Sequence, residues 1–167
     1  MLVRYATDQD VEAITRIYNY YITDSVITFE LDAISNKEMN ERFKSISSVY
    51  PYLVGLVDDE VIGYAYAGRW KERKAYDNTV ETSIYLANNA TGKGYGKELY
   101  SHLLREIKNQ KIRLAIGGVT LPNEASVKLH ESLGYKFVGK FTKVGYKFNQ
   151  WLDVGYWELD LYETEFT

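Results

Sequence analysis

The 167-residue sequence contains no cysteine. Without a thiol the chain forms no disulfide, offers no thiolate to a metal ion and has no cysteine nucleophile. Histidine is nearly as scarce, because only His102 and His130 are present, and they are too few for a histidine-rich metal site. We therefore expect a protein that works without a metal ion.

A positive charge excess and a long apolar run are also missing. The formal net charge is -3, so the molecule as a whole does not attract nucleic acid or anionic lipid, and any anion site must be local. No stretch approaches the roughly 20 apolar residues of a membrane-spanning helix, and no apolar run follows a basic segment at the start of the sequence. These absences predict a cytoplasmic protein with no nucleic-acid partner and no membrane contact.

Composition and length favour one globular domain over residues 1–167. Apolar residues make up 46% of the chain and charged residues 26%, which allows a real core at this length. The sequence has no internal repeat, no low-complexity segment and no linker rich in proline, glycine or serine. Most of its sixteen tyrosines fall at core spacings, which favours packing over stacking on single-stranded nucleic acid.

Apolar periodicity and turn residues predict a mixed α/β order: strand, two helices, three strands, helix, strand, helix and two strands. Capping signals at 7–10 and 35–38 open the first two helices, and a hairpin turn is expected at 58–59. The third helix is expected to follow the glycines near residue 94, and the fourth to run from Asn123 to Leu133. The predicted strands cover residues 2–6, 52–58, 60–68, 79–87, 112–119, about 135–147 and about 151–161.

Three glycines at alternate positions, in the segment "GKGYGK" of residues 92–97, mark a backbone that passes close to something else. The spacing fits neither a P-loop nor the G-x-G-x-x-G dinucleotide fingerprint. Both motifs share a glycine turn that leads into a helix N-terminus, where free N–H groups attract phosphate. Spacing alone leaves two interpretations open: a phosphate site beside Lys93 and Lys97, or a plain strand-to-helix turn with solvated lysines.

Longer segments carry a family resemblance. The segment "ATGKGYGKELY", which follows "ETSIYLA", and the later "TLPNEASVKLHESLGY" resemble the GNAT superfamily of N-acetyltransferases, whose Q/R-x-x-G-x-G/A loop holds the pyrophosphate of acetyl-CoA. Three segments in order, "RWKERKAYDNTVETSIY", "LPNEASVKLHESLGY" and "VGYKFNQWLDVGYWELDL", resemble phosphinothricin and methionine sulfoximine acetyltransferases, and the similarity runs over nearly the whole chain. The resemblance implies a GNAT-like fold, a mixed, mostly antiparallel, twisted sheet of about seven strands with four helices.

The same resemblance implies direct transfer of acetyl from acetyl-CoA to the α-amine of a small amino acid analogue, without a covalent enzyme intermediate. It assigns the cofactor contacts to the strand before the glycine loop, the loop itself and the following asparagine helix. These residues are Ile84, Tyr85, Leu86, Thr91, Gly92, Lys93, Gly94, Tyr95, Gly96, Lys97, Asn123 and Ser132. The strand residues would supply backbone N–H groups to the tetrahedral oxyanion. Thr91 departs from the family pattern, which usually has Arg or Gln there, so one phosphate contact is expected to be either lost or replaced by Lys93.

The catalytic residues implied by the resemblance are Glu81 and His130. Attack on a thioester requires a neutral amine, and Glu81 stands at the family's proposed base, inside the apolar and hydroxylic strand "TVETSIY". A carboxylate half-buried in a cleft there should have a raised pKa. His130 would assist the leaving thiolate. From the residues alone, Glu81 as a solvent-facing glutamate and His130 as a packed histidine remain alternatives.

Recognition of the acceptor is expected to need a cationic contact for its carboxylate. By resemblance Lys71, Arg73 and Tyr76 supply it, although a solvated basic loop is the alternative reading of their segment. The side-chain pocket is assigned to Phe29, Ser83 and Thr120, together with Tyr85. Thr120 stands where phosphinothricin acetylators carry glycine, so the identity of the acceptor is left open.

The proteins that this sequence resembles are homodimers with the substrate cleft near the interface, so a homodimer is expected. The alternating apolar segment "GYWELDL" gives a terminal strand able to contribute to that interface. Two other functions remain alternatives. One is N-acetylation of a peptide N-terminus or another small amine, and the other is acyl-CoA binding by a regulatory module without catalysis.

Overall fold

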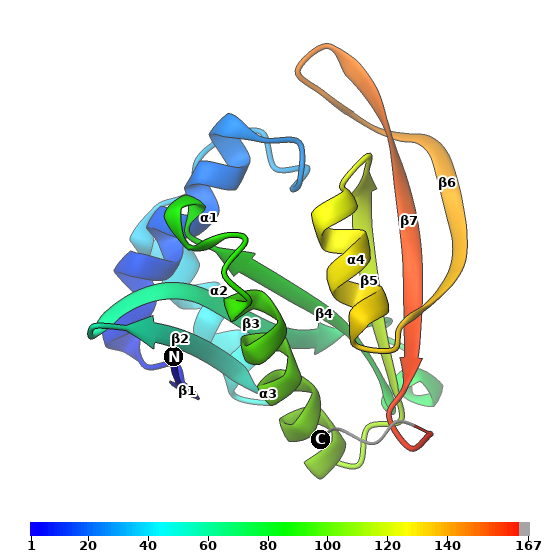
Figure 1. The fold of residues 1–167 in the computed structure, drawn as a ribbon, viewed down its shortest axis with the longest axis horizontal. Coiled ribbons are helices and arrows are strands. Elements are labelled where there is room, and N and C mark those ends of the chain that lie inside the picture. The colour runs from blue at the N-terminus through cyan, green and yellow to red at the C-terminus, as the bar shows by residue number, and fades with distance from the viewer. Residues whose placement is uncertain (164–167) are drawn as a thin grey trace.

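A central sheet organises the computed structural model, which describes residues 1–163 (Figure 1). The sheet has seven strands in the order β1-β2-β3-β4-β5-β7-β6, and every neighbouring pair is antiparallel except β4 with β5. The strands are β1 (Leu2–Tyr5), β2 (Tyr52–Val57), β3 (Glu60–Arg69), β4 (Thr79–Leu86), β5 (Leu114–Leu121), β6 (Lys136–Lys147) and β7 (Gln150–Asp160). The α-helices are α1 (Val11–Asp24), α2 (Asn36–Ser47), α3 (Tyr95–Asn109) and α4 (Glu124–Ser132). The predicted order of elements and the mixed, mostly antiparallel architecture are confirmed.

Local signals in the sequence place the element ends. The Ser35 side chain accepts a hydrogen bond of 3.1 Å from the Glu38 N–H, which caps α2 as predicted. The capping pair at 7–10 instead encloses a short 3-10 turn, η1 (Asp8–Asp10), which runs directly into α1. Asp58 and Asp59 have φ values of 51° and 62°, the left-handed pair that a tight two-residue hairpin requires between β2 and β3.

Most predicted strand ends lie within one residue of the observed ones, and two differences beside the functional region have a local cause. The strand expected at 112–119 begins at Leu114 and continues to Leu121, because its pairing with β7 extends to Asp153. Arg113 precedes the strand, and its N–H donates to Asn78 O instead. The helix expected from Asn123 begins one residue later, because the Asn123 side chain caps it by accepting from the Ser126 N–H.

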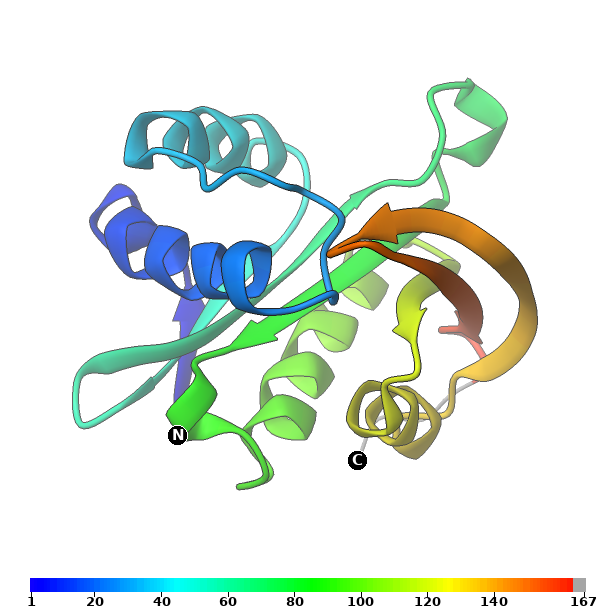
Figure 2. The same cartoon turned by 90° about the horizontal axis from the view of Figure 1, so that it is seen from above.

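Helices cover both faces of the sheet (Figure 2). One face carries α1 and α2, whose apolar residues pack with β2 and β3 around Ile14, Val54 and Tyr64. The other face carries α3 and α4, and there Leu99 and Leu103 of α3 are fully buried against the sheet. Burial of these apolar stripes stabilises the layers by roughly 25 cal/mol for each Å² removed from water.

The sheet opens between β4 and β5. Their parallel pairing covers only Thr79–Glu81 against Leu114–Ile116. Beyond it β4 continues with β3 and β5 continues with β7, so the two strands diverge (Figure 1). Backbone groups on the facing sides of the opening therefore have no ladder partner, and the opening is where a ligand can meet main-chain donors.

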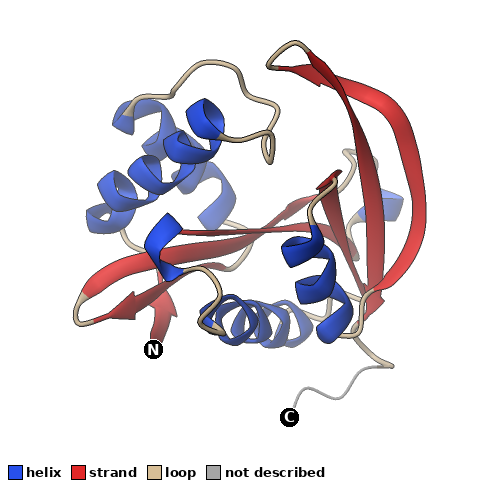
Figure 3. Ribbon diagram, turned by 45° about the horizontal axis from the view of Figure 1, so that its top comes forward, coloured by secondary structure: helices blue, strands red, loops and turns tan. Residues whose placement is uncertain are grey.

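A long hairpin of β6 and β7 extends past the rest of the sheet (Figure 3). Several of its apolar side chains are exposed: Phe137, Val138, Phe141, Val144, Tyr146, Phe148 and Trp151. No helix within residues 1–163 has the length and apolar character to cross a membrane. An apolar surface of this extent on a sheet hairpin is typical of a protein–protein contact.

Candidate active site

A cavity of about 360 Å³ occupies the opening between β4 and β5, and we refer to it as the central cleft. Its walls come from the loop after α1, the middle of β4, the end of β5, the start of α4 and the β6–β7 hairpin. The lining residues are Ile27, Thr28, Phe29, Glu81, Thr82, Ser83, Ile84, Tyr85, Gly118, Val119, Thr120, Asn123, Ser126, His130, Val144, Val154 and Tyr156. The central cleft therefore joins five elements that are far apart in the sequence.

A second cavity of about 340 Å³ lies at the N-terminus of α3, beside the glycine loop, and we refer to it as the loop cavity. It is lined by Tyr21, Ile27, Ile84, Leu86, Thr91, Gly92, Gly94, Gly96, Lys97, Asn123, Ala125, Ser126 and Leu129. Ile27, Ile84, Asn123 and Ser126 line both cavities. The two spaces therefore adjoin, and a long ligand can reach from the glycine loop to the opening in the sheet.

The glycine loop has the geometry of an anion site. Gly92 and Gly94 have φ values of 74° and 83°, which favour glycine, and a Cβ added at either would meet no atom within 4 Å. Gly94 is the N-cap of α3 and provides no side chain, so the first N–H groups of the helix face open space beside Lys97. Gly96 has a different role, because a Cβ there would crowd Leu86 and Leu129 at 3.3 and 3.5 Å.

The backbone of β4 presents donors to the opening. The Ala87 N–H donates to Ile62 O on β3 at 2.8 Å, and N–H directions alternate along a strand. The N–H groups of Ile84 and Leu86 therefore point away from β3, toward the opening, whereas that of Tyr85 points toward β3. The Tyr21 hydroxyl donates to Leu86 O at 2.6 Å and so fixes this end of β4. Two of the three predicted oxyanion donors thus face the opening.

Glu81 lies on β4 at the point where β4 and β5 separate, and it lines the central cleft. Burial raises the pKa of Glu81, and the positive charge of Lys71 opposes the rise. The carboxylate lies close to Gly118 of β5, since a Cβ added there would stand 3.5 Å from Glu81 Oε1 and 3.3 Å from the Tyr156 ring. A side chain at position 118 would therefore pack directly against both the carboxylate and the Tyr156 ring.

His130 lines the central cleft but both of its ring nitrogens have protein partners. Nδ1 lies 2.7 Å from Ser126 O, so Nδ1 carries the hydrogen and donates it. Nε2 then accepts from the Tyr100 hydroxyl at 3.1 Å, and that hydroxyl also contacts Thr82 Oγ1 at 2.6 Å. Burial lowers the pKa of His130, which keeps the ring neutral. A Cβ at Gly117 would overlap the ring, so the imidazole packs directly against the β5 backbone at this glycine.

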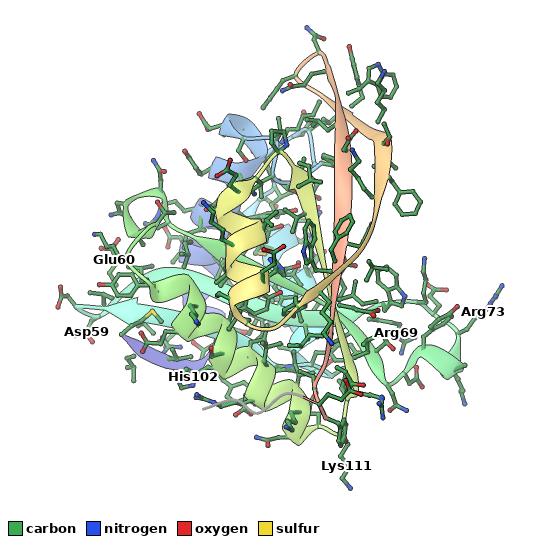
Figure 4. The ribbon with its side chains drawn as sticks, turned by 45° about the vertical axis from the view of Figure 1, so that its right-hand side comes forward. Asp59, Glu60, Arg69, Arg73, His102 and Lys111 are labelled. Atoms are coloured by element: carbon green, nitrogen blue, oxygen red, sulfur yellow. The ribbon has the colours of Figure 1, made fainter. Side chains whose placement is uncertain are left out.

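The structure brings together some of the predicted acceptor residues and separates others. Phe29, Ser83 and Thr120 line the central cleft. Lys71 lines a different hollow of about 470 Å³ beside Trp70 and β6. Arg73 and Tyr76 lie at the projecting turn η2 (Lys74–Tyr76) and line none of these cavities, and Figure 4 shows Arg73 pointing away from the body of the molecule.

Most predicted cofactor residues gather at the two cavities. Lys93, Tyr95 and Ser132 do not: Tyr95 lines a hollow beside Met1, and the Ser132 hydroxyl donates to Leu129 O near the far end of α4. Sequence reasoning missed the cleft residues Ile27, Thr28, Thr82, Gly118, Val119, Ser126, Val144, Val154 and Tyr156. Of these, Ser126 had a local signal, because it lies one helical turn before His130, whereas Gly118 meets Glu81 only through long-range packing. Residues 1–163 hold no cluster of three or more His, Asp or Glu side chains that could bind a metal ion.

The sequence of this chain is similar to those of known acetyltransferases. The family profile described as "Acetyltransferase (GNAT) domain" matches residues 3–155. A phosphinothricin N-acetyltransferase of Streptomyces viridochromogenes is 39% identical over 95% of this chain and 86% of the relative. An L-methionine sulfoximine/L-methionine sulfone acetyltransferase of Salmonella typhimurium is 32% identical over 98% of this chain and 96% of the relative.

The similarity extends to three dimensions. The crystal structure of a GNAT superfamily phosphinothricin acetyltransferase from Sinorhizobium meliloti in complex with AcCoA has a TM-score of 0.94 and 36% sequence identity to this chain. The alignment covers 99% of this chain and 92% of that one. The profile match includes all residues that line the central cleft except Tyr156.

Proposed function

This chain belongs to the GNAT family of acetyltransferases, and from that premise we propose that it transfers acetyl from acetyl-CoA to the α-amine of a small amino acid analogue. The observation that carries the proposal is the position of Glu81. Its carboxylate lies in the central cleft where β4 and β5 separate, and this cleft adjoins the loop cavity. The acetyl-CoA-bound relative supports acetyl-CoA as the donor.

The two cavities suit the two halves of acetyl-CoA. The diphosphate would accept hydrogen bonds from the N–H groups at the start of α3, and Lys97 would add positive charge. Gly92 and Gly94 have no side chains that would block its approach to the backbone. Asn123 and Ser126, which line both cavities, would border the pantetheine arm. The thioester would then lie in the opening, opposite the free N–H groups of β4.

In the proposed reaction Glu81 takes a proton from the acceptor ammonium, directly or through one water molecule. The neutral amine attacks the thioester carbon, a C–N bond forms, and the oxyanion is stabilised by the N–H groups of Ile84 and Leu86. The C–S bond then breaks, and the thiolate leaves with the bonding electrons. The nitrogen gives its second proton to solvent, and the thiolate takes up a proton from solvent. The raised pKa of Glu81 brings its basicity closer to neutral pH.

The prediction that His130 assists the thiolate stays a prediction. Its ring nitrogens contact Ser126 O and the Tyr100 hydroxyl, so the neutral ring has no free hydrogen to give. A thiol with a pKa of about 8.5 is already a fair leaving group. These contacts support a role in holding α4 against β5, which keeps the cleft wall in place.

A homodimer would bring Arg73 and Tyr76 to an acceptor cleft. Both side chains are exposed and lie away from the central cleft of their own chain. The exposed apolar side chains of the β6–β7 hairpin support association with a second copy. We propose that the η2 turn of one copy reaches the central cleft of the other, where Arg73 pairs with the acceptor carboxylate.

The proposal also includes a single acetyltransferase domain over the whole chain and a cytoplasmic location.

A thiol-release assay with acetyl-CoA tests the function. Phosphinothricin, methionine sulfoximine and methionine sulfone are compared with a polyamine and with a short peptide that has a free N-terminus. We expect turnover with at least one amino acid analogue and little with the polyamine, since a basic acceptor loop disfavours a cation. Turnover confined to the peptide, or acetyl-CoA binding without turnover, would replace the proposal by one of the two alternatives.

A further inference from the structure

One wall of the central cleft has no regular secondary structure. It is formed by Ile27, Thr28 and Phe29, which belong to the 25–35 segment between α1 and α2. Figure 2 shows this segment leaving α1 and reaching across to β6. Neither a helix nor a strand ladder holds this wall, so its position depends on tethers from elsewhere in the molecule.

Lys147, the last residue of β6, provides such a tether. Its side chain is among the most buried in the protein, with 2% of the residue exposed, and within residues 1–163 it forms no ion pair. Its ammonium donates to Thr28 O at 2.8 Å and to Tyr21 O at 3.4 Å. Burial lowers the pKa of Lys147, and the charge of Glu30 opposes that change. The Phe148 ring centroid lies 5.0 Å from the ammonium, but both hydrogen bonds of this buried lysine go to backbone carbonyls rather than to a carboxylate.

The position of Tyr21 explains part of this arrangement. Tyr21 lies in the last turn of α1, where the carbonyl groups lack intrahelical partners and the helix end is negative. An ammonium there is stabilised by the helix end, which offsets part of the cost of burying a charge. Lys147 therefore caps α1 together with the Ser25 hydroxyl, which donates to the same carbonyl at 2.8 Å, and its ammonium also holds the segment that follows the helix.

Two further contacts hold the same wall. The Thr120 hydroxyl of β5 donates to Ile27 O at 3.3 Å. The Phe29 ring lies on Gly145 of β6, where an added Cβ would overlap the ring. Three consecutive wall residues are thus each held by the β5–β7–β6 side of the opening, although the segment itself comes from the β1–β4 side.

We propose that Lys147 is a positioning residue for acceptor recognition, which holds the 27–29 wall of the central cleft through its bonds to the Thr28 and Tyr21 carbonyls. Lys147 itself is buried behind this wall and does not touch the acceptor. The inference rests on the proposed function, since the acceptor is the molecule that this wall would contact. Loss of the Lys147 ammonium should weaken acceptor binding and leave acetyl-CoA binding at the glycine loop unchanged.

The test compares Lys147→Met with Lys136→Met, an exposed lysine on the same strand. Methionine keeps the apolar stem and removes the ammonium. In the thiol-release assay we expect Lys147→Met to raise the acceptor KM by about tenfold, with the acetyl-CoA KM within about twofold of wild type. Hydrogen exchange of the free protein should show faster exchange of the 26–31 amides, with the α3 amides unchanged. The Lys136→Met control should match wild type in both measurements.

An acceptor KM and a 26–31 exchange rate like those of wild type would overturn the inference, and so would a uniform loss of activity that follows the folded fraction. If Lys147→Met does not fold, Lys147→Gln decides, since glutamine removes the charge and keeps an N–H donor for the wall carbonyls. A smaller rise in acceptor KM would support the inference, and no rise would overturn it. Failure of the proposed function would appear separately, as wild-type protein that acetylates none of the amino acid analogues.

Discussion

Glu81 is the side chain on which the proposed chemistry depends most. Glu81→Gln keeps the shape of the carboxylate and removes its basicity. We expect turnover to fall by roughly 10²-fold to 10⁴-fold with acetyl-CoA affinity unchanged, because only proton removal is lost. The measurement is thiol release at saturating acceptor, with acetyl-CoA binding measured separately. Glu60→Gln, at the exposed β2–β3 turn, serves as the control. Wild-type turnover in Glu81→Gln at neutral pH would exclude Glu81 as the base.

The raised pKa of Glu81 also predicts two pH effects. Since the base must be ionised, kcat/KM should fall as the pH drops through the raised pKa, which lies above the ordinary value of 4.5. The same shift has the opposite sign for stability, because a folded state with a raised carboxyl pKa binds the proton more tightly than the unfolded chain. Its contribution is fullest below 4.5 and is lost as the pH rises. Urea unfolding should therefore show Glu81→Gln at least as stable as wild type at neutral pH.

His130 is expected to matter more for stability than for turnover. His130→Asn removes the two hydrogen bonds that the ring forms with the Tyr100 hydroxyl and Ser126 O, so the free energy of unfolding should fall by about 1–3 kcal/mol. Turnover at saturating substrates should fall by less than about tenfold, since the thiolate leaves without a proton from the ring. Denaturant unfolding and thiol release measure the two effects. A folded, stable variant with a loss as large as that of Glu81→Gln would instead make His130 a catalytic acid.

At the scale of elements, the proposed acetyl-CoA site depends on the turn between β4 and α3. Gly94→Val would place a side chain in the open space before the α3 N–H groups, at a φ of 83° that valine adopts only with strain. Gly94→Asn separates the two effects, because asparagine tolerates the left-handed region. Both variants should raise the acetyl-CoA KM by about tenfold or more and leave the acceptor KM unchanged, since charge-assisted N–H bonds to a diphosphate are lost.

The control for the glycine turn is Gly139→Val on β6, where an added Cβ also meets no atom within 4 Å but φ is not left-handed. Its acetyl-CoA KM should equal that of wild type. Folded Gly94 variants with an unchanged acetyl-CoA KM would show that the loop does not approach the diphosphate. Circular dichroism identifies folded variants before the kinetic comparison.

At the scale of the whole molecule, the proposed dimer predicts complementation between two inactive variants. Glu81→Gln damages the base, and Arg73→Ala damages the acceptor contact that we assign to the other copy. Co-expression should give mixed dimers with one intact site, so activity should return to about a quarter of wild type in a statistical mixture. Each variant alone is the control, and sedimentation at the assay concentration measures association.

The same experiment has a clear contrary outcome. If Arg73 served the cleft of its own chain, every mixed dimer would carry one defect in each site, and activity would stay at the level of the single variants. A monomer in sedimentation, with full activity in the wild-type protein, would also contradict the dimer. After either result, the exposed apolar side chains of the β6–β7 hairpin would have no assigned role in this site.

The sequence by itself determined the features that depend on neighbours in the chain. The cap at Ser35, the Asp58-Asp59 turn and the glycine turn before α3 are confirmed. Each is decided by backbone conformation and hydrogen bonds within a few residues, so residue type is sufficient. The position of Glu81 on a strand was predictable for the same reason, since the alternation of apolar and hydroxylic residues marks β4.

Only the tertiary structure decided how these pieces meet. The separation of β4 from β5 after Glu81, which creates the central cleft, follows from pairing with different neighbours, and no local pattern encodes it. Lys147 reads as an ordinary polar residue of a strand, yet it bonds to Thr28, 119 residues away in sequence. The direction of Arg73 away from its own cleft is likewise invisible in the basic loop that carries it. Contacts between residues this far apart in the sequence depend on the packing of the whole chain. Closing so long a loop is decided by the fold, because a residue's type does not specify which distant residue it will contact.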